Sequence, residues 1–393
     1  PFKYMEYKNI LNMTNKSIEW KRIDDVYHTP LFNVSKIKPK FVNQGHIGDC
    51  YFITALSRIA KKGEMVQTFF EKQLPDDILG KIPDSLNLKC GAVVIYFRVF
   101  GRRTPVLIDT LIPFIKDHSN PFGGLNPVFS TVINPDNSPW FLLVEKAFAK
   151  LNGSYSNIIG GFFADSFYHL YGYYKKSYDI IPGEMTKNAY KILQYQYHGC
   201  LMDASIDTDD KVELDTLKKL NLHTTHSYLL IKARKYKDRL FFQLRNPWGC
   251  GEFKTDYTKD DPELSKYLTE NKINGFFWID DKDFFTHFTD LSVAKPVDPF
   301  WFMQYFSFEL KPTKVIGMPQ LNQHRNFTFQ LLQDVPSDKK ARVRILVEKR
   351  NKDYEKLRLK WSYVRIYVKR NGGQKLTNDC DKSRSSRGVL TYS

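Results

Sequence analysis

Apolar side chains between residues 50 and 60 follow the spacing of a helix that buries one face. They are Phe52, Ala55, Leu56 and Ile59, and they come directly after a glycine-punctuated turn at residues 44–49. This pattern predicts a helix over residues 50–60 whose first turn contains Cys50.

A second helix is predicted to begin at Pro139. Ser138 is a suitable N-cap, Pro139 suits the first helical position, and Gly153 stops the pattern. The apolar residues on one predicted face are Trp140, Leu143, Val144, Ala147, Phe148 and Leu151. We expect this helix to belong to the core.

Shorter apolar runs predict strands. Residues 93–100 and 104–109 predict a hairpin. Further along, residues 228–232 and 240–244 flank a turn, and residues 276–279 add a third short strand. We expect these last three strands to be antiparallel neighbours in one sheet.

After Pro296 the pattern changes to short alternating strands with almost no helical periodicity. The predicted strands are residues 306–310, 327–332, 341–347 and 363–368. In the last two, outward Arg or Lys residues alternate with inward Val, Ile and Leu. This pattern is typical of an antiparallel β-sandwich and predicts a domain boundary near Pro296.

With 393 residues, 42% of them hydrophobic, the chain can fill the cores of about two domains, which excludes a disordered chain. The longest uninterrupted apolar run, residues 92–97, is far shorter than the roughly 18 residues of a membrane-spanning helix. The polar start lacks a signal-peptide profile. We therefore expect an intracellular, cytoplasmic protein, and the initial proline suggests a segment excised from a longer one.

The distribution of charge changes the expected partners. Residues 311–393 carry 20 Lys and Arg against 7 Asp and Glu, which accounts for most of the net charge of +16. A cationic domain of this kind could dock on anionic phospholipid, giving membrane association, or on an acidic protein partner; the alternative is a solvated charged face. Nucleic acid is not expected, because the basic residues alternate with core positions and no stacking-aromatic motif accompanies them.

Cys50 is the candidate nucleophile. The five cysteines show no CxxC pair, which argues against a disulfide framework or a zinc site. Because unpaired N–H groups at a helix start favour a thiolate, we expect a lowered pKa for Cys50. Gln44 can fold its side-chain amide toward the same point, and with the Cys50 backbone N–H it would supply two donors to an oxyanion.

His226 and Asn246 are candidates for the rest of the site. His226 precedes one predicted strand and Asn246 ends the next, so an antiparallel pair of strands would bring the imidazole and the carboxamide side by side. The asparagine oxygen can then fix the tautomer of the ring while the other ring nitrogen faces a thiol. The order Cys, His, Asn is that of papain-like proteases; a transglutaminase would carry Asp in place of Asn246.

Four motifs resemble those of the calpain family more specifically. Gln44-Gly-His-Ile-Gly-Asp-Cys50-Tyr-Phe is similar to QGxxGDCWF, and residues 140–153 are similar to the calpain stretch FWxxLLEKAYAKLNG. His226-Ser-Tyr and Asn246-Pro-Trp-Gly resemble HAY and NPWG. Several separate motifs in the right order make chance similarity an inadequate explanation.

The resemblance covers roughly residues 39–290, and residues 262–278 look most like the PalB branch of calpains. It implies an α+β fold with a two-lobed papain-like cysteine protease core, made of a helical lobe at residues 1–172 and a β-rich lobe at residues 173–296. A basic, C2-like antiparallel β-sandwich over residues 297–393 would follow, and this agrees with the change of pattern at Pro296.

The resemblance also implies roles for individual residues. Cys50 would be the nucleophile, His226 the general base and then the general acid, and Asn246 the residue that orients the ring. Gln44 would donate to the oxyanion. Trp248 would shield the hydrogen bond between His226 and Asn246 from water, although plain core packing is the alternative for this tryptophan.

Three further positions concern the substrate cleft. Gly160 and Gly161 resemble the family's glycine pair, which lets an extended substrate backbone dock where a side chain would block it. Tyr51 stands where the family has tryptophan, and Thr225 stands where it usually has glycine. These departures bear on cleavage preference more than on activity.

The resemblance raises the question of calcium, because conventional calpain cores bind two calcium ions that swing the lobes together. Asp165 and Glu252 stand where two of the family's ligands would be, with ordinary salt-bridged carboxylates as the alternative. However, Phe41, Asn274 and Phe276 occupy positions where the family pattern has acids, and a hard cation needs such oxygen ligands. We therefore expect that the core requires no cofactor.

Taken together, these patterns predict a calpain-type cysteine endopeptidase that makes limited cuts in protein substrates through thioester chemistry. The alternative is a catalytically silent calpain-like scaffold, in which the fold persists as an interaction module. The presence of Cys50, His226 and Asn246 together argues against the scaffold.

Overall fold

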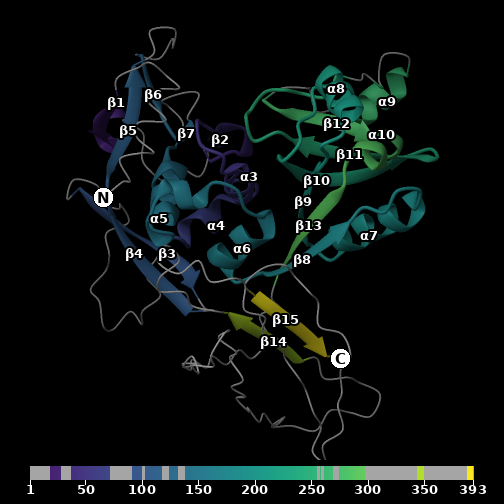
Figure 1. Ribbon diagram of the computed structural model, residues 1–393. Coiled ribbons are helices and arrows are strands. Elements are labelled where there is room, and N and C mark those ends of the chain that lie inside the picture. The colour runs from purple at the N-terminus through teal and green to yellow at the C-terminus, as the bar shows by residue number, and fades with distance from the viewer. Residues whose placement is uncertain are drawn as a thin grey trace, which may run out of the picture. The chain divides into compact units, whose positions relative to one another are not determined.

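The computed structural model describes residues 18–27, 37–70, 91–99, 102–116, 124–131, 138–254, 257, 261–268, 274–296, 343–348 and 387–392. The chain divides into two compact units, Pro1–Met303 and Gln304–Ser393. The helices and sheets that carry the candidate site belong to the first unit (Figure 1).

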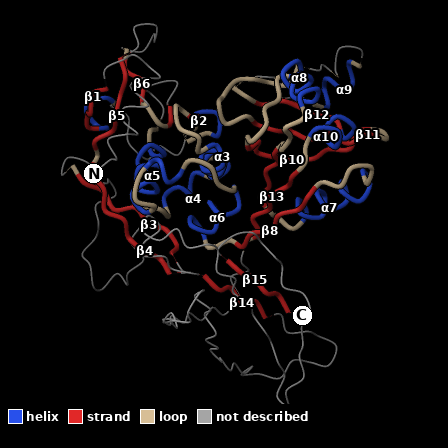
Figure 2. The backbone as a smooth tube through the Cα atoms, viewed as in Figure 1, coloured by secondary structure: helices blue, strands red, loops and turns tan. Residues whose placement is uncertain are grey.

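Helices dominate the first part of this unit, and Figure 2 shows several of them gathered together. They are α2 (Ile23–Val26), η2 (Pro39–Phe41), α3 (Cys50–Ile59), α4 (Gly63–Gln67), α5 (Trp140–Leu151), η4 (Tyr155–Ile158) and α6 (Phe163–Tyr171). The apolar faces of α3 and α5 meet in the core, where the rings of Phe52 and Phe148 stack with their centroids 4.0 Å apart. The helix predicted after the glycine-punctuated turn is therefore confirmed.

The start predicted for the second helix was wrong by one residue. Helix α5 begins at Trp140, and Pro139 is its N-cap residue. The backbone of Pro139, with φ −90° and ψ 19°, has not yet reached the helical region, so the proline precedes the first turn instead of opening it.

Short sheets flank these helices. Strands β3 (Ala92–Val99) and β4 (Arg102–Asp109) form the predicted hairpin, with Val99 opposite Arg102. A second sheet has the order β1 (Ile18–Arg22), β5 (Leu111–Lys116), β6 (Leu125–Pro127), and β2 (Asn43–Gln44) pairs with β7 (Ser130–Thr131).

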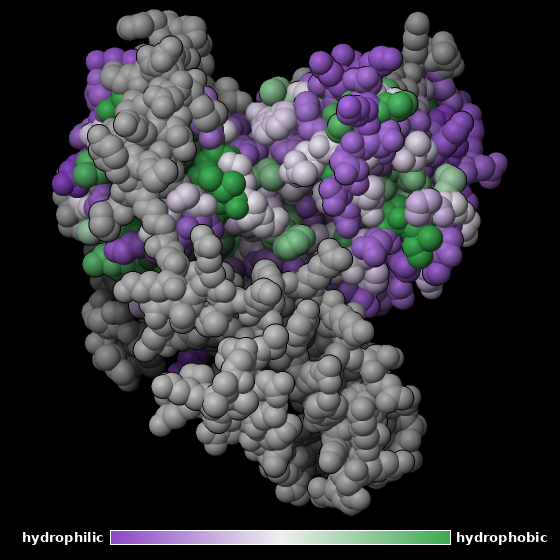
Figure 3. Space-filling view, in the orientation of Figure 1, coloured by the Kyte–Doolittle hydropathy of each residue, from purple (hydrophilic) through white to green (hydrophobic). Residues whose placement is uncertain are grey.

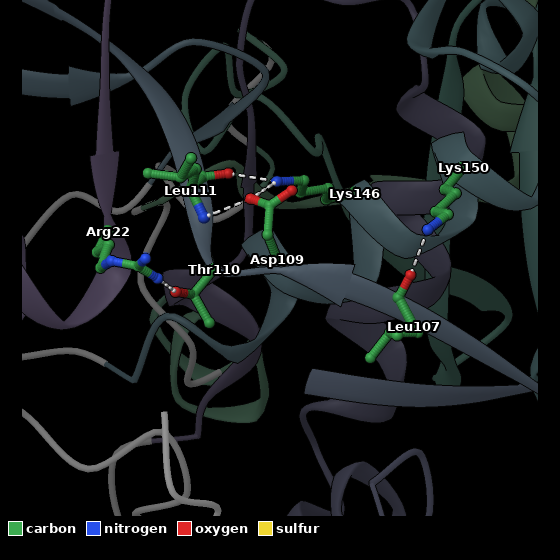
Figure 4. Close-up of polar contacts among 7 residues, drawn as sticks. All are labelled: Arg22, Leu107, Asp109, Thr110, Leu111, Lys146 and Lys150. Carbon is green, nitrogen blue, oxygen red and sulfur yellow. Dashed lines mark hydrogen bonds and ion pairs between the residues drawn. The ribbon is translucent and has the colours of Figure 1, made fainter. Parts of the chain in front are cut away.

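Two lysines fasten α5 to the strands beside it (Figure 4). The Lys146 ammonium donates to Asp109 Oδ1 and to the Leu111 carbonyl, both at 2.6 Å. Lys150 Nζ reaches the carbonyl of Leu107 at 2.5 Å. Helix α5 is thus fixed by polar contacts on its strand side and by packing against α3 on its core side.

The second part of the unit is built on a six-stranded antiparallel sheet. Its strands, in spatial order, are β12 (Phe276–Asp280), β11 (Arg239–Arg245), β10 (Ser227–Tyr236), β9 (Leu201–Ser205), β13 (Asp290–Lys295) and β8 (Tyr174–Asp179). Its helices are α7 (Met185–Tyr197), α8 (Lys211–Leu220), α9 (Pro262–Tyr267) and α10 (Asp281–His287). Strand β11 pairs with both β10 and β12, which confirms the three antiparallel neighbours that were predicted.

The two largest hydrophobic cores among the described residues underlie this arrangement. The first runs from Ile23 to Leu170 and also takes in Leu229 and Ala294; the second runs from Ile180 to Val293. We call the corresponding parts the first lobe (residues 18–172) and the second lobe (residues 173–296); the domain limits drawn from the sequence stay predictions. Helix α3 packs against β10 and α6 against β13, so strands of the second lobe lie directly on helices of the first.

The visible surface of the second lobe is largely hydrophilic, with small apolar patches between polar side chains (Figure 3). Among the described residues, no helix combines the length and apolar character needed to cross a membrane.

In the second unit the structure describes one antiparallel pair, β14 (Val343–Glu348) with β15 (Arg387–Tyr392). Strand β14 overlaps the strand predicted at residues 341–347. The strands predicted at residues 306–310, 327–332 and 363–368 lie outside the described residues, as do Cys90 and Cys380. The mixed helix-and-strand core is established, and the β-sandwich stays a prediction.

Candidate active site

Cys50 is the first residue of α3 and follows a turn that only glycine permits. A Cβ atom on Gly45 would lie 2.1 Å from the carbonyl oxygen of Phe129, so a side chain at this position would collide with the backbone. His46 N donates to the Val128 carbonyl at 2.9 Å beside this point. The turn is therefore packed against residues 128–129, directly before β7. This contact fixes the position at which the helix that begins at Cys50 starts.

The second lobe supplies a buried histidine and asparagine. His226, directly before β10, and Asn246, directly after β11, lie side by side because these strands are antiparallel neighbours. His226 Nε2 lies 2.9 Å from Asn246 Oδ1, and the two residues are 5% and 0% exposed. The backbone N–H of Trp248 also donates to Asn246 Oδ1, at 3.1 Å, which fixes the oxygen end of the carboxamide.

This geometry determines the tautomer of the ring. Because a carboxamide oxygen only accepts, Nε2 of His226 carries the proton and donates it to Asn246. Nδ1 of His226 is then unprotonated and can accept a proton from another group. Burial lowers the pKa of His226 to about 4, so at neutral pH the ring is uncharged.

The sulfur of Cys50 lies beside the strand that His226 precedes. The backbone N–H groups of Ser227, the residue after His226, and of Tyr51 act to lower the pKa of Cys50. Burial nevertheless raises the pKa of Cys50 to about 11, and the nearby Asp49 acts in the same direction. The expectation of a lowered pKa was wrong, because burial raises the pKa by more than the N–H groups at the helix start lower it.

Trp248 covers the histidine. The centroid of its ring lies 4.4 Å from that of His226 and 4.4 Å from that of His223. Trp248 is itself 38% exposed, whereas His226 is 5% exposed. The half-exposed tryptophan ring therefore packs against the buried imidazole, and its shielding of the His226–Asn246 hydrogen bond stays a prediction.

Gln44 has its side chain inside the turn that precedes Cys50. Its Nε2 donates to the carbonyl of Ile47 at 2.6 Å, and its backbone N–H donates to Pro247 O at 2.9 Å. One amide hydrogen is thus engaged within the turn, and the second remains for another acceptor. The oxyanion role of Gln44 stays a prediction.

Tyr51 and the two glycines meet at the edge of the first lobe. A Cβ atom on Gly161 would lie 2.5 Å from the ring of Tyr51, so the tyrosine can pack here only against glycine. Gly160 is exposed, has φ +71°, and would have open space around a Cβ atom. Its N–H donates to the Gly48 carbonyl at 2.9 Å, which ties the glycine pair to the turn before Cys50.

The two candidate calcium ligands are occupied by other partners. Asp165 on α6 forms an ion pair with Lys175 at 3.1 Å. Glu252 accepts a hydrogen bond from the Gly275 N–H at 2.8 Å. Across the described ranges, three or more His, Cys, Asp or Glu side chains nowhere gather in a way that could hold a metal ion. With an ammonium group on Asp165, the residues present do not fit a calcium site.

The sequence patterns did not predict that a buried arginine lies next to the site. Arg245 ends β11 and is 1% exposed. It donates to Ser57 Oγ at 2.9 Å, to Val42 O at 3.0 Å and to Asn43 Oδ1 at 2.8 Å, all in the first lobe. Burial lowers its pKa to about 9. The signal available in the sequence was a charged residue between an apolar strand and Asn246.

Two buried acids near Cys50 were also missed. Asp203 on β9 accepts from Ser227 Oγ at 2.5 Å, and burial raises its pKa to about 7. Ser227 stands where the calpain motif HAY has alanine, and this departure was the available signal. The second acid is Asp49, the N-cap residue of α3, which is 0% exposed.

Comparison with known proteins supports the same family. The family model described as "Calpain family cysteine protease" matches residues 3–295. The mouse protein "Calpain-1 catalytic subunit" is 29% identical over 294 residues, which is 70% of this chain and 38% of that protein. Mouse "Calpain-5" is 26% identical over 306 residues, covering 70% of this chain and 45% of that protein.

The chain therefore aligns with less than half of the length of these curated relatives. Residues 3–295, which the family model matches, contain all of the residues at the candidate site. With a family model matched over residues 3–295, the chain belongs to the calpain family of cysteine proteases.

Proposed function

We propose that the chain is a cysteine endopeptidase of calpain type that makes limited cuts in protein substrates. The observation that carries the proposal is the buried hydrogen bond from His226 Nε2 to Asn246 Oδ1, directly before Ser227, whose backbone N–H acts to lower the pKa of Cys50. Such a pair leaves Nδ1 as the base of a thiol–imidazole couple.

The resting site holds a neutral thiol and a neutral imidazole, because the pKa of Cys50 is raised and that of His226 is lowered. In the proposed reaction, His226 Nδ1 takes the thiol proton as the sulfur attacks the peptide carbonyl carbon. The tetrahedral oxyanion collapses to a thioester when His226 returns this proton to the leaving amine. His226 then accepts one proton from a water molecule as the water oxygen attacks the thioester carbon. The imidazolium passes this proton to the departing Cys50 sulfur, and the carboxylic acid that is released loses its own proton to solvent.

The remaining site residues have supporting roles in this proposal. Gln44 and the Cys50 N–H would donate to the oxyanion, each donor lowering the barrier by about 3 kcal/mol. Gly160 and Gly161 would accept the extended backbone of the substrate, which the open space at Gly160 supports. Trp248 would exclude water from the His226–Asn246 hydrogen bond.

We further propose that this core needs no calcium. The ion pair of Lys175 with Asp165 supplies positive charge where a calcium ligand was considered, and Arg245 joins the lobes through three hydrogen bonds. Both contacts support alignment of the lobes without a metal ion.

The test is cleavage of a fluorescently labelled unstructured protein by the full chain, with excess calcium and with a chelator. We expect equal rates in the two conditions, and no cleavage by the Cys50→Ser and His226→Ala variants. Cleavage only with calcium would overturn calcium independence alone. Cleavage that survives in both variants would overturn the proposed site, and folded wild type without any cleavage would favour the scaffold.

For residues 297–393 we propose a basic, C2-like β-sandwich that docks on anionic phospholipid at the cytoplasmic face of a membrane. The excess of Lys and Arg after residue 311 supports this proposal. Sedimentation with vesicles of neutral or anionic lipid tests it. We expect binding only to anionic vesicles, lost at high salt; equal sedimentation with both lipids would contradict the proposal.

A further inference from the structure

Asp49 is an N-cap residue that does not cap its helix. An aspartate in this position ordinarily accepts a hydrogen bond from an N–H group of the first turn. The Asp49 side chain accepts none there, although it directly precedes Cys50, and it is 0% exposed. Its carboxyl group therefore points into the protein interior.

The group that it meets is a second buried acid, Glu145 on α5. The two acids lie close together, because the rings of Phe52 and Phe148, three residues after each acid, stack with their centroids 4.0 Å apart. Glu145 is 1% exposed, and its Oε2 accepts from Ser130 Oγ at 2.8 Å and from Ser130 N at 3.2 Å. Helix α5 is in turn held by Lys146 and Lys150, so the position of Glu145 is fixed.

Three carboxyl oxygens of this pair lack a hydrogen-bond donor within the described ranges. Both carboxyl oxygens of Asp49 and Oε1 of Glu145 find no donor among the described residues. Two ionised carboxylates cannot remain in contact without solvent, because each would be both desolvated and repelled by the other. One proton placed between them removes the repulsion and joins two of these three oxygens in a hydrogen bond.

We propose that Asp49 and Glu145 share one proton and act as positioning residues. The position of this proton between them determines how much negative charge lies beside the Cys50 thiol. The proposal deepens the proposed function, because it concerns the same sulfur. It describes the ionisation of that sulfur, however, and can be tested without any cleavage reaction.

The pKa directions agree with this arrangement. Burial, and next the charge of Glu145, raise the pKa of Asp49 well above its usual value, and burial raises that of Glu145 to about 7. Asp49 opposes ionisation of both Cys50 and Tyr51.

Two other acids face the same groups. Asp203 also raises the pKa of Cys50, and Asp165 also raises that of Tyr51. A test must therefore separate the shared proton from the charges of these two carboxylates.

Isosteric amides allow this separation, because they move the charge in opposite directions. In Asp49→Asn the new amide donates to Glu145, so the single charge moves away from the sulfur and the pKa of Cys50 falls. In Glu145→Gln the amide donates to Asp49, so the charge is confined next to the sulfur and the pKa of Cys50 rises. Neither substitution touches Asp203 or Asp165.

The experiment measures the rate of Cys50 alkylation by iodoacetamide from pH 6 to pH 9, quantified by mass spectrometry on the peptide that contains Cys50. In this range the rate is proportional to the thiolate fraction, so at each pH we expect it to rise about tenfold in Asp49→Asn and to fall about tenfold in Glu145→Gln. The control is Glu19→Gln, which removes an ion-paired carboxylate on β1, and its rate should match wild type.

A rate change in the same direction in both variants, or no change in either folded variant, would overturn the proposal.

If a variant does not fold, the proposal is tested instead by infrared spectroscopy of the Asp203→Asn, Asp290→Asn double variant. That protein lacks the other two described acids with a raised pKa. We expect a protonated carboxyl C=O band to persist at pH 6, and its absence would overturn the proposal. Failure of peptide cleavage with the alkylation rate changes present would refute the proposed function alone.

Discussion

At the scale of single residues, Thr225 shows how local strain can accompany a catalytic position. It directly precedes His226 and has φ +50°, a conformation that is strained for a β-branched residue. Its N–H donates to the Ile206 carbonyl at 2.9 Å, which holds the chain in this conformation. The glycine that the family usually has here would adopt it without strain.

We therefore expect Thr225→Gly to stabilise the fold. The relief of strain should exceed the extra entropy of glycine in the unfolded chain, giving a gain of about 1 kcal/mol in the free energy of unfolding. Urea denaturation measures it. The control Thr225→Ala keeps a Cβ atom and should gain less than the glycine variant, and a glycine variant less stable than wild type would show that Thr225 is not strained.

The sequence allowed Cys50, His226 and Asn246 to be chosen by residue type and order, because a helix start and two adjacent strands can be recognised from local patterns. The ionisation of Cys50 could not be predicted in the same way. It depends on how completely the two lobes exclude water from the sulfur and on the inward turn of Asp49, and both are consequences of long-range packing.

At the scale of elements, the hairpin β10–β11 carries the side chain that joins the two lobes. Arg245 at the end of β11 contacts α3 through Ser57 and the chain before it through Val42 and Asn43. The helices and strands themselves could be predicted from apolar spacing. This contact could not, since a strand-terminal arginine normally faces solvent.

We expect Arg245→Met to cost about 3 kcal/mol in the free energy of unfolding, because three buried acceptors would lose their donor. The matched control is Arg239→Met on the same strand, which removes a half-exposed ion pair with Asp280 and should cost less than about 1 kcal/mol. Equal costs for the two variants, measured by denaturant unfolding, would show that Arg245 does not join the lobes.

Asp203 gives the sheet a pH-dependent stability. Its pKa is raised from 3.8 to about 7 by burial, so its contribution is fully present below pH 4 and is lost as pH rises through about 7. Relative to Asp203→Asn, we expect wild type to lose up to about 1.4 kcal/mol per pH unit between pH 5 and pH 7.

Unfolding free energies of both proteins across this range measure the effect, and parallel curves would contradict it. Asp109→Asn is a control of opposite sign. Burial opposes ionisation of Asp109, but its ion pair with Lys146 prevails and lowers its pKa. Wild type should therefore gain stability relative to Asp109→Asn as pH rises through the acidic range.

At the scale of the whole molecule, the two lobes already contact each other at the site. Thr54 on α3 donates to the Ser227 carbonyl at 3.5 Å, and Gln44 N donates to Pro247 O at 2.9 Å. Each lobe thus holds one half of the Cys–His couple, and neither half could act alone. Two-lobed organisation was implied by the resemblance to calpains, whereas the closed contact depends on side chains far apart in sequence.

The most direct test of the proposed site is covalent labelling of Cys50 by a peptidyl epoxide inhibitor of thiol proteases in the presence of a calcium chelator. We expect one label per chain, on Cys50, at a rate that falls at least tenfold in a folded His226→Ala variant. Labelling spread equally over Cys50 and the other cysteines, or equally fast in the two proteins, would contradict the account.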